Sequence, residues 1–181
     1  MEIAEKLHDI FHGSDRAHGS FTVENGSLGK KTQGKAKTIK TAGASIQHWE
    51  DHLTGKEGLG VIPIDEDNLV KWGAIDIDVY SLDLVKLVQK IEEFKLPLVV
   101  CRSKSGGAHV FCFLKETVPA GDMQDKLREI SAGLGYGGVE IFPKQREVLV
   151  ERGDIGSWLN MPYFEGDDSM RYGFDTKGNA L

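Results

Sequence analysis

The clearest hydrophobic pattern in this chain is a regular succession of strand-like and helix-like segments between residues 69 and 142. Apolar runs predict strands at 69–78, 97–102, 108–114 and 138–142, and helical spacing predicts helices at 82–94 and 121–133. The order β-α-β-β-α-β is that of the ferredoxin-like, or RRM-like, split unit. Because crossover connections are right-handed, we expect the strand order 4-1-3-2, with both helices on one face and the other face open. The fold class is therefore expected to be α/β, of the α+β type.

The segments on either side of this unit have weaker patterns. Residues 2–12 predict an amphipathic helix, Ser45 is expected to cap a short second helix, and 60–64 predicts a strand. The segment 13–44 is rich in Gly, Lys, Ser and Thr, and its basic stretch 29–37 is expected to be a hairpin loop or a mobile arm. The tail 143–181 is expected to hold one short helix near 155–159. These patterns divide the chain into an N-terminal α/β part at 1–68, the central unit at 69–142 and an extension at 143–181.

The composition is that of an ordinary soluble globular protein, with 181 residues, 40% hydrophobic and 28% charged. The net charge of −6 argues against a stand-alone binder of duplex DNA, which is usually basic. No apolar run is long enough to cross a bilayer and the acidic N-terminus is not a signal peptide, so we expect no membrane contact and a cytoplasmic location. Cys101 and Cys112 lie in apolar runs and are expected to be buried, reduced thiols.

The polar residues of the predicted sheet suggest a metal site. Asp76 and Asp78 are two apart on one strand, so their side chains point to the same face. His109 and Glu140 lie on the two neighbouring strands and are expected to share that face. Adjacent carboxylates resist joint ionisation unless a cation lies between them, and Mg²⁺ or Mn²⁺ is the natural partner for oxygen ligands. The sequence therefore predicts a divalent metal site formed by Asp76, Asp78 and Glu140.

The connection at 102–108 has the composition of an anion-binding loop. It contains Ser103, Lys104 and Ser105, followed by Gly106 and Gly107, and it leads directly to the histidine. Two glycines let backbone N–H groups turn toward an anion, while the hydroxyls and the lysine add donors. A further basic group at 144–146 follows Glu140. A triphosphate tail needs such a cradle beside a metal site.

These residues carry a resemblance to a known family. The chain resembles the catalytic domain of archaeo-eukaryotic primases, especially the primase-polymerases of phages, plasmids and mobile elements. The family's first motif is two acids one residue apart, here Asp76 and Asp78, and its second is a Ser-rich loop that ends in His, here 103–109. Its third is a carboxylate on a later strand, here Glu140, where many members have Asp. The resemblance covers about residues 45 to 172, includes the stretches 49–55 and 158–164, and lacks the common zinc-binding insertion.

The resemblance implies a catalytic domain of a template-dependent DNA primase-polymerase, within the cytoplasm of the host if the gene belongs to a phage. Two Mg²⁺ or Mn²⁺ ions would be held by the three carboxylates, one to activate the primer 3′-OH and one to clamp the nucleoside triphosphate. Its partners would be nucleoside triphosphates, single-stranded DNA template and primer, and a helicase domain or protein, since members usually carry one. The implied nucleotide-binding residues are Ser103, Lys104, Ser105, Gly107, His109, Lys144, Asn160 and Tyr163.

The sequence leaves open several interpretations of single residues and of the function. Asn160 equally suits a turn cap, and Tyr80 suits either a contact to the sugar 2′ position or, preferably, core packing. A nucleotide cyclase-type enzyme also places two acids on a ferredoxin-like sheet. A non-catalytic RRM-like module is the third alternative, and it would display aromatic side chains on its open face for base stacking.

Overall fold

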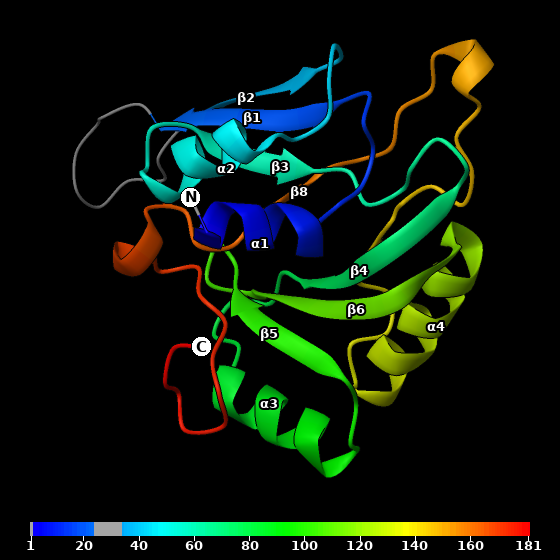
Figure 1. Cartoon of the computed structure of the whole chain (residues 1–181). Helices are drawn as coiled ribbons and strands as arrows, with labels where there is room; N and C mark the ends of the chain where they lie inside the picture. Colours follow the sequence, from blue (N-terminus) through cyan, green and yellow to red (C-terminus); the bar gives the residue numbers. More distant parts are fainter. Residues whose placement is uncertain (1, 24–33) are drawn as a thin grey trace.

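The structure, a computed structural model, describes residues 2–23 and 34–181 and contains two four-stranded antiparallel sheets (Figure 1). One sheet has the order β5-β6-β4-β7, and this confirms the predicted order 4-1-3-2. Two helices cover one of its faces (Figure 1). The elements of this unit are β4 (Leu69–Ile77), α3 (Leu84–Glu93), β5 (Leu98–Arg102), β6 (Ala108–Pro119), α4 (Ala120–Gly133) and β7 (Glu140–Phe142). The α+β fold class is therefore confirmed.

Two strands of this unit differ from their predicted lengths. β6 continues past residue 114 to Pro119 and passes directly into α4, because its distal end pairs with the start of β4 beyond a register shift. β7 begins at Glu140 and not at 138, since Gly138 has φ +85° and turns the chain there. The short β7 still pairs in register with the middle of β4.

The second sheet was not predicted. It has the order β2-β1-β3-β8 and is formed by β1 (His18–Val23), β2 (Gly34–Ile39), β3 (Gly58–Val61) and β8 (Leu159–Asn160). The predicted hairpin loop or mobile arm at 29–37 is wrong for 34–37, which belong to β2 and pair with β1, while 29–33 lie outside the described residues. β2 is a polar, exposed strand with little apolar alternation, which is why its pattern resembled a loop.

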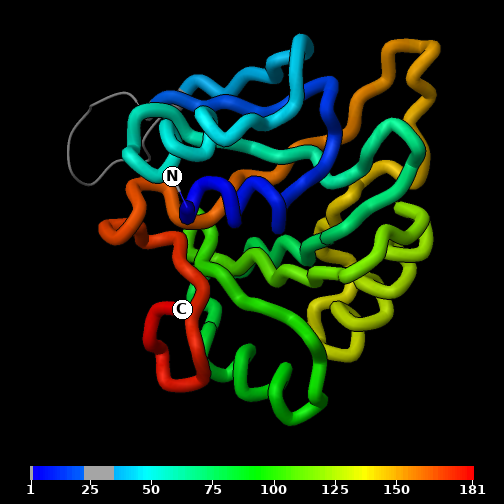
Figure 2. The backbone as a smooth tube through the Cα atoms, in the orientation of Figure 1, coloured from blue at the N-terminus to red at the C-terminus, as the bar shows by residue number. Residues whose placement is uncertain are grey.

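The C-terminal tail also differs from its prediction. There is no helix near 155–159; instead β8 pairs with β3, and the tail carries the 3₁₀ turns η1 (Val150–Arg152) and η2 (Gly166–Asp168). After α4 the chain rises past the end of the β5-β6-β4-β7 sheet, the lower sheet in Figure 2, and joins the β2-β1-β3-β8 sheet, the upper one. The sheet β2-β1-β3-β8 therefore takes one of its strands from the segment after residue 143.

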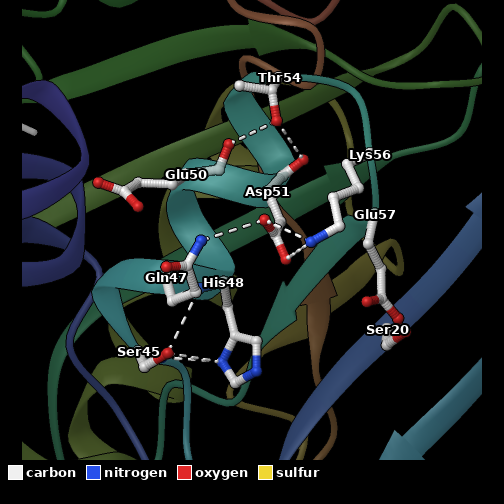
Figure 3. A network of polar contacts seen from close by, with 9 residues as sticks. All are labelled: Ser20, Ser45, Gln47, His48, Glu50, Asp51, Thr54, Lys56 and Glu57. Carbon is white, nitrogen blue, oxygen red and sulfur yellow. Dashed lines mark hydrogen bonds and ion pairs between the residues drawn. The ribbon is translucent and has the colours of Figure 1, made fainter.

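The helices α1 (Glu2–Ile10) and α2 (Ile46–Leu53) lie with the upper sheet, and the three together form what we call the upper layer (Figure 1). As predicted, Ser45 caps α2, where its Oγ accepts from the His48 backbone N–H in a capping box. Figure 3 shows this cap together with a network of polar contacts at the surface. In this network Lys56, in the turn after α2, forms an ion pair with Asp51 of α2. Among the described helices, none combines the length and apolar character needed to span a membrane.

The face opposite α3 and α4 is not open, contrary to the prediction. Its apolar end is buried beneath the upper layer in a second core. Phe11, directly after α1, packs at its centre, with its ring centroid 5.2–5.5 Å from those of four neighbouring aromatic rings. This core contains Trp49, Trp72, Ala74, Phe111, Phe142, Leu159 and Met161. The polar end of the same face lies beyond it, at the rim between the two layers.

Candidate functional site

The centre of the site is Asp76, because the register of β4 sets it directly opposite two other candidates. It pairs with His109 of β6 on one side and with Glu140 of β7 on the other. Ile75 and Ile77 are fully buried among the residues of the helix-covered core. Strand alternation thus delivers the polar and apolar residues to opposite faces, as the sequence predicted. Neighbouring strands lie about 5 Å apart, so the three side chains start from adjacent backbone positions.

Asp76 is a poorly satisfied buried acid. Its side chain is 15% exposed, and its buried Oδ1 has no hydrogen-bond partner among the described residues. The nearest base is Nε2 of His109, at 3.5 Å from Oδ1. Burial, assisted by the negative charges of Asp78 and Glu140, raises the pKa of Asp76 to about 6. A cation at this oxygen would relieve both the desolvation and the repulsion.

His109 is buried beside this carboxylate. Burial lowers its pKa to about 4, with Arg171 acting in the same direction and Asp78 against it. The ring also bonds the backbone carbonyl of Asn160 in β8, which links the two sheets at the site. The imidazole is therefore neutral at pH 7 and is held in place by the upper sheet.

Asp78 connects the carboxylates to the loop after β5. Its exposed side chain accepts a hydrogen bond of 3.1 Å from Ser105 Oγ, and Ser105 Oγ lies 3.3 Å from Ser103 Oγ. The loop closes through a 3.0 Å bond from the Ser103 N–H to the Gly107 carbonyl. A Cβ at Gly107 would lie 2.1 Å from the Ile77 carbonyl oxygen, so only glycine lets the loop approach β4 this closely.

Glu140 adopts a different environment from that of Asp76. Its side chain is 60% exposed, because β7 lies at the edge of the sheet. Its Oε2 pairs with Lys144 Nζ at 2.8 Å, and the same ammonium lies 5.0 Å from the centre of the Phe142 ring. Lys144 thus accompanies the carboxylates from the β7 side.

The carboxylates fit a divalent cation chemically but are not assembled around one. Among the residues that the structure describes, no group of three or more His, Cys, Asp or Glu side chains is arranged to hold a metal. The donors suit a hard cation nevertheless, since they are oxygens and one of them is buried without a partner. The carboxylate of Glu140 would have to turn from Lys144 to join Asp76 and Asp78.

The remaining predicted residues are dispersed. Lys104 is exposed on the loop, and Asn160 contributes its backbone to β8. Tyr163 is engaged elsewhere: its hydroxyl donates to the Leu181 carbonyl at 3.3 Å and accepts from the Gly173 N–H at 3.2 Å. Tyr80 is 68% exposed just after Asp78, so the preference for core packing is wrong.

Sequence reasoning missed Arg171. Its guanidinium lies 5.0 Å from the ring centre of Phe21 and 5.1 Å from that of Phe164. It also lines a pocket together with Ser103 and Lys104 of the predicted phosphate loop. A single arginine in a polar tail has no periodic context, and the one available signal was its place soon after the stretch 158–164 that resembles the family.

Comparisons with known proteins place this chain in a family. The family model of the archaeo-eukaryotic primase domain of the TOTE conflict system matches residues 22–170, which is more than half of the chain. A search of curated proteins found no match. The family match covers the β5-β6-β4-β7 sheet, most of the other sheet and every residue predicted for the site. The chain therefore belongs to the archaeo-eukaryotic primase family, as a domain of the TOTE conflict system type, and is a primase-like nucleotidyltransferase.

Proposed function

We propose that this domain is a template-dependent DNA primase-polymerase. It transfers nucleotides from nucleoside triphosphates to a 3′-OH on a single-stranded DNA template. The single observation that carries this proposal is the register that sets Asp76 directly opposite both His109 and Glu140. Family membership supports the reaction class, and the arrangement of the site supports its use on a phosphate substrate.

The residues of the site divide into two groups. Asp76, Asp78 and Glu140 would hold Mg²⁺ or Mn²⁺, which when bound supplies charge neutralisation at the phosphate and activation of the attacking hydroxyl. The loop from Ser103 to Gly107 orients the phosphates through hydroxyls and backbone N–H groups. The neutral His109 lies beside Asp76 and adds no further charge to the site. Positioned donors and cations supply most of the catalysis in phosphoryl transfer.

One feature of the fold weighs against the non-catalytic RRM-like alternative. Such a module needs exposed aromatic rings on its sheet face to stack bases. Here Trp72 and Phe111 are fully buried under the upper layer, and Phe142 is nearly so. The part of the face that remains accessible carries carboxylates, which repel phosphate in the absence of a cation.

The decisive experiment is nucleotide incorporation on single-stranded DNA, with and without a primer, in Mg²⁺ and in Mn²⁺. The double variant Asp76→Asn with Asp78→Asn is expected to lose at least about a hundredfold in rate, the scale of electrostatic contributions at other active sites. Asp9→Asn, an exposed acid on α1, is the matched control and should retain full activity. Extension that persists in the double variant would refute the site.

The same assay separates the competing enzymes. A cyclase would release a cyclic nucleotide from triphosphates alone, with no dependence on template. A primase-polymerase would lengthen a chain only when template is present. The cytoplasmic location and the helicase partner remain predictions of the sequence and are part of this proposal.

A further inference from the structure

Arg171 occupies an environment that its structural contacts do not fully explain. The guanidinium lies over two neighbouring rings, those of Phe21 in β1 and Phe164 in the tail. One of its terminal nitrogens, Nη1, is buried and has no hydrogen-bond partner among the described residues. A buried guanidinium N–H without an acceptor is costly, so an arginine kept in this state suggests an acceptor supplied by a ligand.

The side chain lines a pocket of about 260 Å³ between the loop after β5 and the tail. From the loop come Ser103 and Lys104, and from the tail come Glu165, Ser169 and Met170. Ser103 and Ser169 are buried and form part of its wall. Met170, by contrast, is 65% exposed and stands at the opening.

The pocket brings two cationic side chains together. Lys104 Nζ lies 5.2 Å from the centre of the Phe21 ring, the same ring that Arg171 covers at 5.0 Å. Burial and the neighbouring charge of Arg171 lower the pKa of Lys104, and burial lowers that of Arg171, with Glu165 acting against it. Two like charges in a half-buried pocket repel, and an anion between them would remove that cost.

The pocket is joined to the carboxylate site through the loop. Ser103, in its wall, is linked by Ser105 to Asp78 through contacts of 3.3 and 3.1 Å. The charge of Arg171 also reaches His109, whose pKa it helps to lower. A polyphosphate chain that starts at the carboxylates would therefore meet the pocket along the same loop.

We propose that Arg171, together with Lys104 and Ser103, binds a phosphate group of the substrate. This inference rests on the proposed function, which supplies phosphate as the reacting group, and it adds a positioning residue that the three family motifs do not contain. The planar guanidinium presents several donors at once and suits a phosphate better than an ammonium does. The phosphate comes either from the triphosphate tail of the nucleotide or from the backbone of the DNA strand.

Binding measured without catalysis tests this proposal. Inorganic tripolyphosphate and a single-stranded oligothymidylate would be titrated into the full chain in chelator, with dissociation constants measured by calorimetry. Arg171→Gln is expected to weaken binding of at least one probe by tenfold or more, the scale of a charge-assisted hydrogen bond. Arg171→Lys should recover part of the loss, and Arg152→Gln, an exposed arginine of η1, should bind as the wild type does.

The two probes distinguish the two sources. A loss confined to tripolyphosphate assigns the pocket to the nucleotide tail, and a loss confined to the oligonucleotide assigns it to the strand backbone. Unchanged affinity of Arg171→Gln for both probes overturns the proposal.

Two further measurements guard against misfolding and against confusion with the proposed function. If Arg171→Gln does not melt cooperatively, Lys104→Gln replaces it, since that side chain is exposed and its removal leaves the aromatic pair in place. The Asp76→Asn, Asp78→Asn double variant should bind tripolyphosphate in chelator at least as tightly as the wild type. Extension activity in that variant would overturn the metal site alone, whereas a failed binding test would overturn only the role of Arg171.

Discussion

The buried carboxylate of Asp76, at the centre of the site, lowers the stability of the fold. Its Oδ1 is buried without a hydrogen-bond partner among the described residues, and two further carboxylates lie nearby. When the pKa of a carboxyl group is higher in the folded chain than in the unfolded chain, the stability of the fold decreases as the pH rises between the two pKa values. The penalty is absent below the unfolded value of 3.8 and complete above about 6. At pH 7 the acid therefore opposes folding in the absence of a cation.

The variant Asp76→Asn is accordingly expected to be more stable than the wild type in chelator at pH 7.5. A pKa rise from 3.8 to about 6 corresponds to an upper bound of about 3 kcal/mol. Urea denaturation followed by circular dichroism measures the difference. Mg²⁺ or Mn²⁺ should raise the melting temperature of the wild type and leave Asp76→Asn nearly unchanged. A variant that is less stable than the wild type in chelator would contradict this account of the acid.

His52 makes the fold sensitive to acid at a position remote from catalysis. The ring is fully buried, its Nε2 lies 2.8 Å from the Pro162 carbonyl, and its Nδ1 accepts from the Leu59 N–H at 2.9 Å. Both nitrogens are thus satisfied only in the neutral ring. Burial is the main reason that its pKa falls to about 4.

At His52 the unfolded chain therefore binds more protons than the folded one between pH 4 and 6.5, so the contribution of this residue to stability falls as the pH is lowered through this range. His52 contributes up to about 3 kcal/mol to that loss. Unfolding free energies at pH 7.0, 5.5 and 4.5 should show a shallower decline for His52→Gln than for the wild type. His8→Gln, on the partly exposed face of α1, should keep the wild-type slope.

At the scale of elements, the loop after β5 depends on its contact with β4. Gly107 lies against the Ile77 carbonyl, and the same loop carries Ser103 and Ser105 toward Asp78. The loop and the end of β4 consequently form one unit, and the spacing between serines and aspartates is set by backbone contact.

Gly107→Ala should therefore impair activity and stability together. The added Cβ would lie 2.1 Å from a backbone oxygen, and overpacking of this kind costs about 1–3 kcal/mol. Nucleotide incorporation should fall at least about tenfold as the serines shift. The matched control is Gly133→Ala at the end of α4, where a Cβ meets nothing within 4 Å. That control should be neutral or slightly stabilising, because alanine favours the helix; an equal loss in both variants would rule out the contact as the cause.

At the scale of the whole molecule, the two sheets share an aromatic core centred on Phe11. Its ring contacts Trp49 of the upper layer and Trp72, Phe111 and Phe113 of the lower sheet. Since His109 is also bonded to the backbone of β8, the rim of the site is formed by both layers. The domain should then unfold as one cooperative unit.

Phe11→Ala is expected to destabilise the whole domain by about 3–5 kcal/mol, because it removes a buried ring from the centre of this core. Phe94→Ala, whose side chain is 50% exposed at the end of α3, should cost less than about 1 kcal/mol. Chemical denaturation followed by tryptophan fluorescence and by far-UV circular dichroism provides the test. Separate transitions in the wild type would show that the layers are independent.

Much of the lower sheet and its acids could be predicted from the sequence because their signals are local. Alternation along 69–77 sends Asp76 and Ile75 to opposite faces, and the order of strands and helices leaves few topologies. Glu140 lies on the predicted strand, at the edge of the sheet, but its ion pair with Lys144 is a side-chain contact that a strand pattern does not reveal.

The sequence by itself determined the split βαββαβ unit, the facing positions of Asp76, His109 and Glu140, and the glycine-hinged loop beside them. The tertiary structure alone decided that a second sheet covers the apolar half of that face, and that Arg171 lies beside the loop. The physical reason is the distance along the chain between the residues that make contact. Periodicity records how neighbouring residues are buried, whereas β3 pairs with β8, and Arg171 meets Phe21, across chain separations that leave no local pattern.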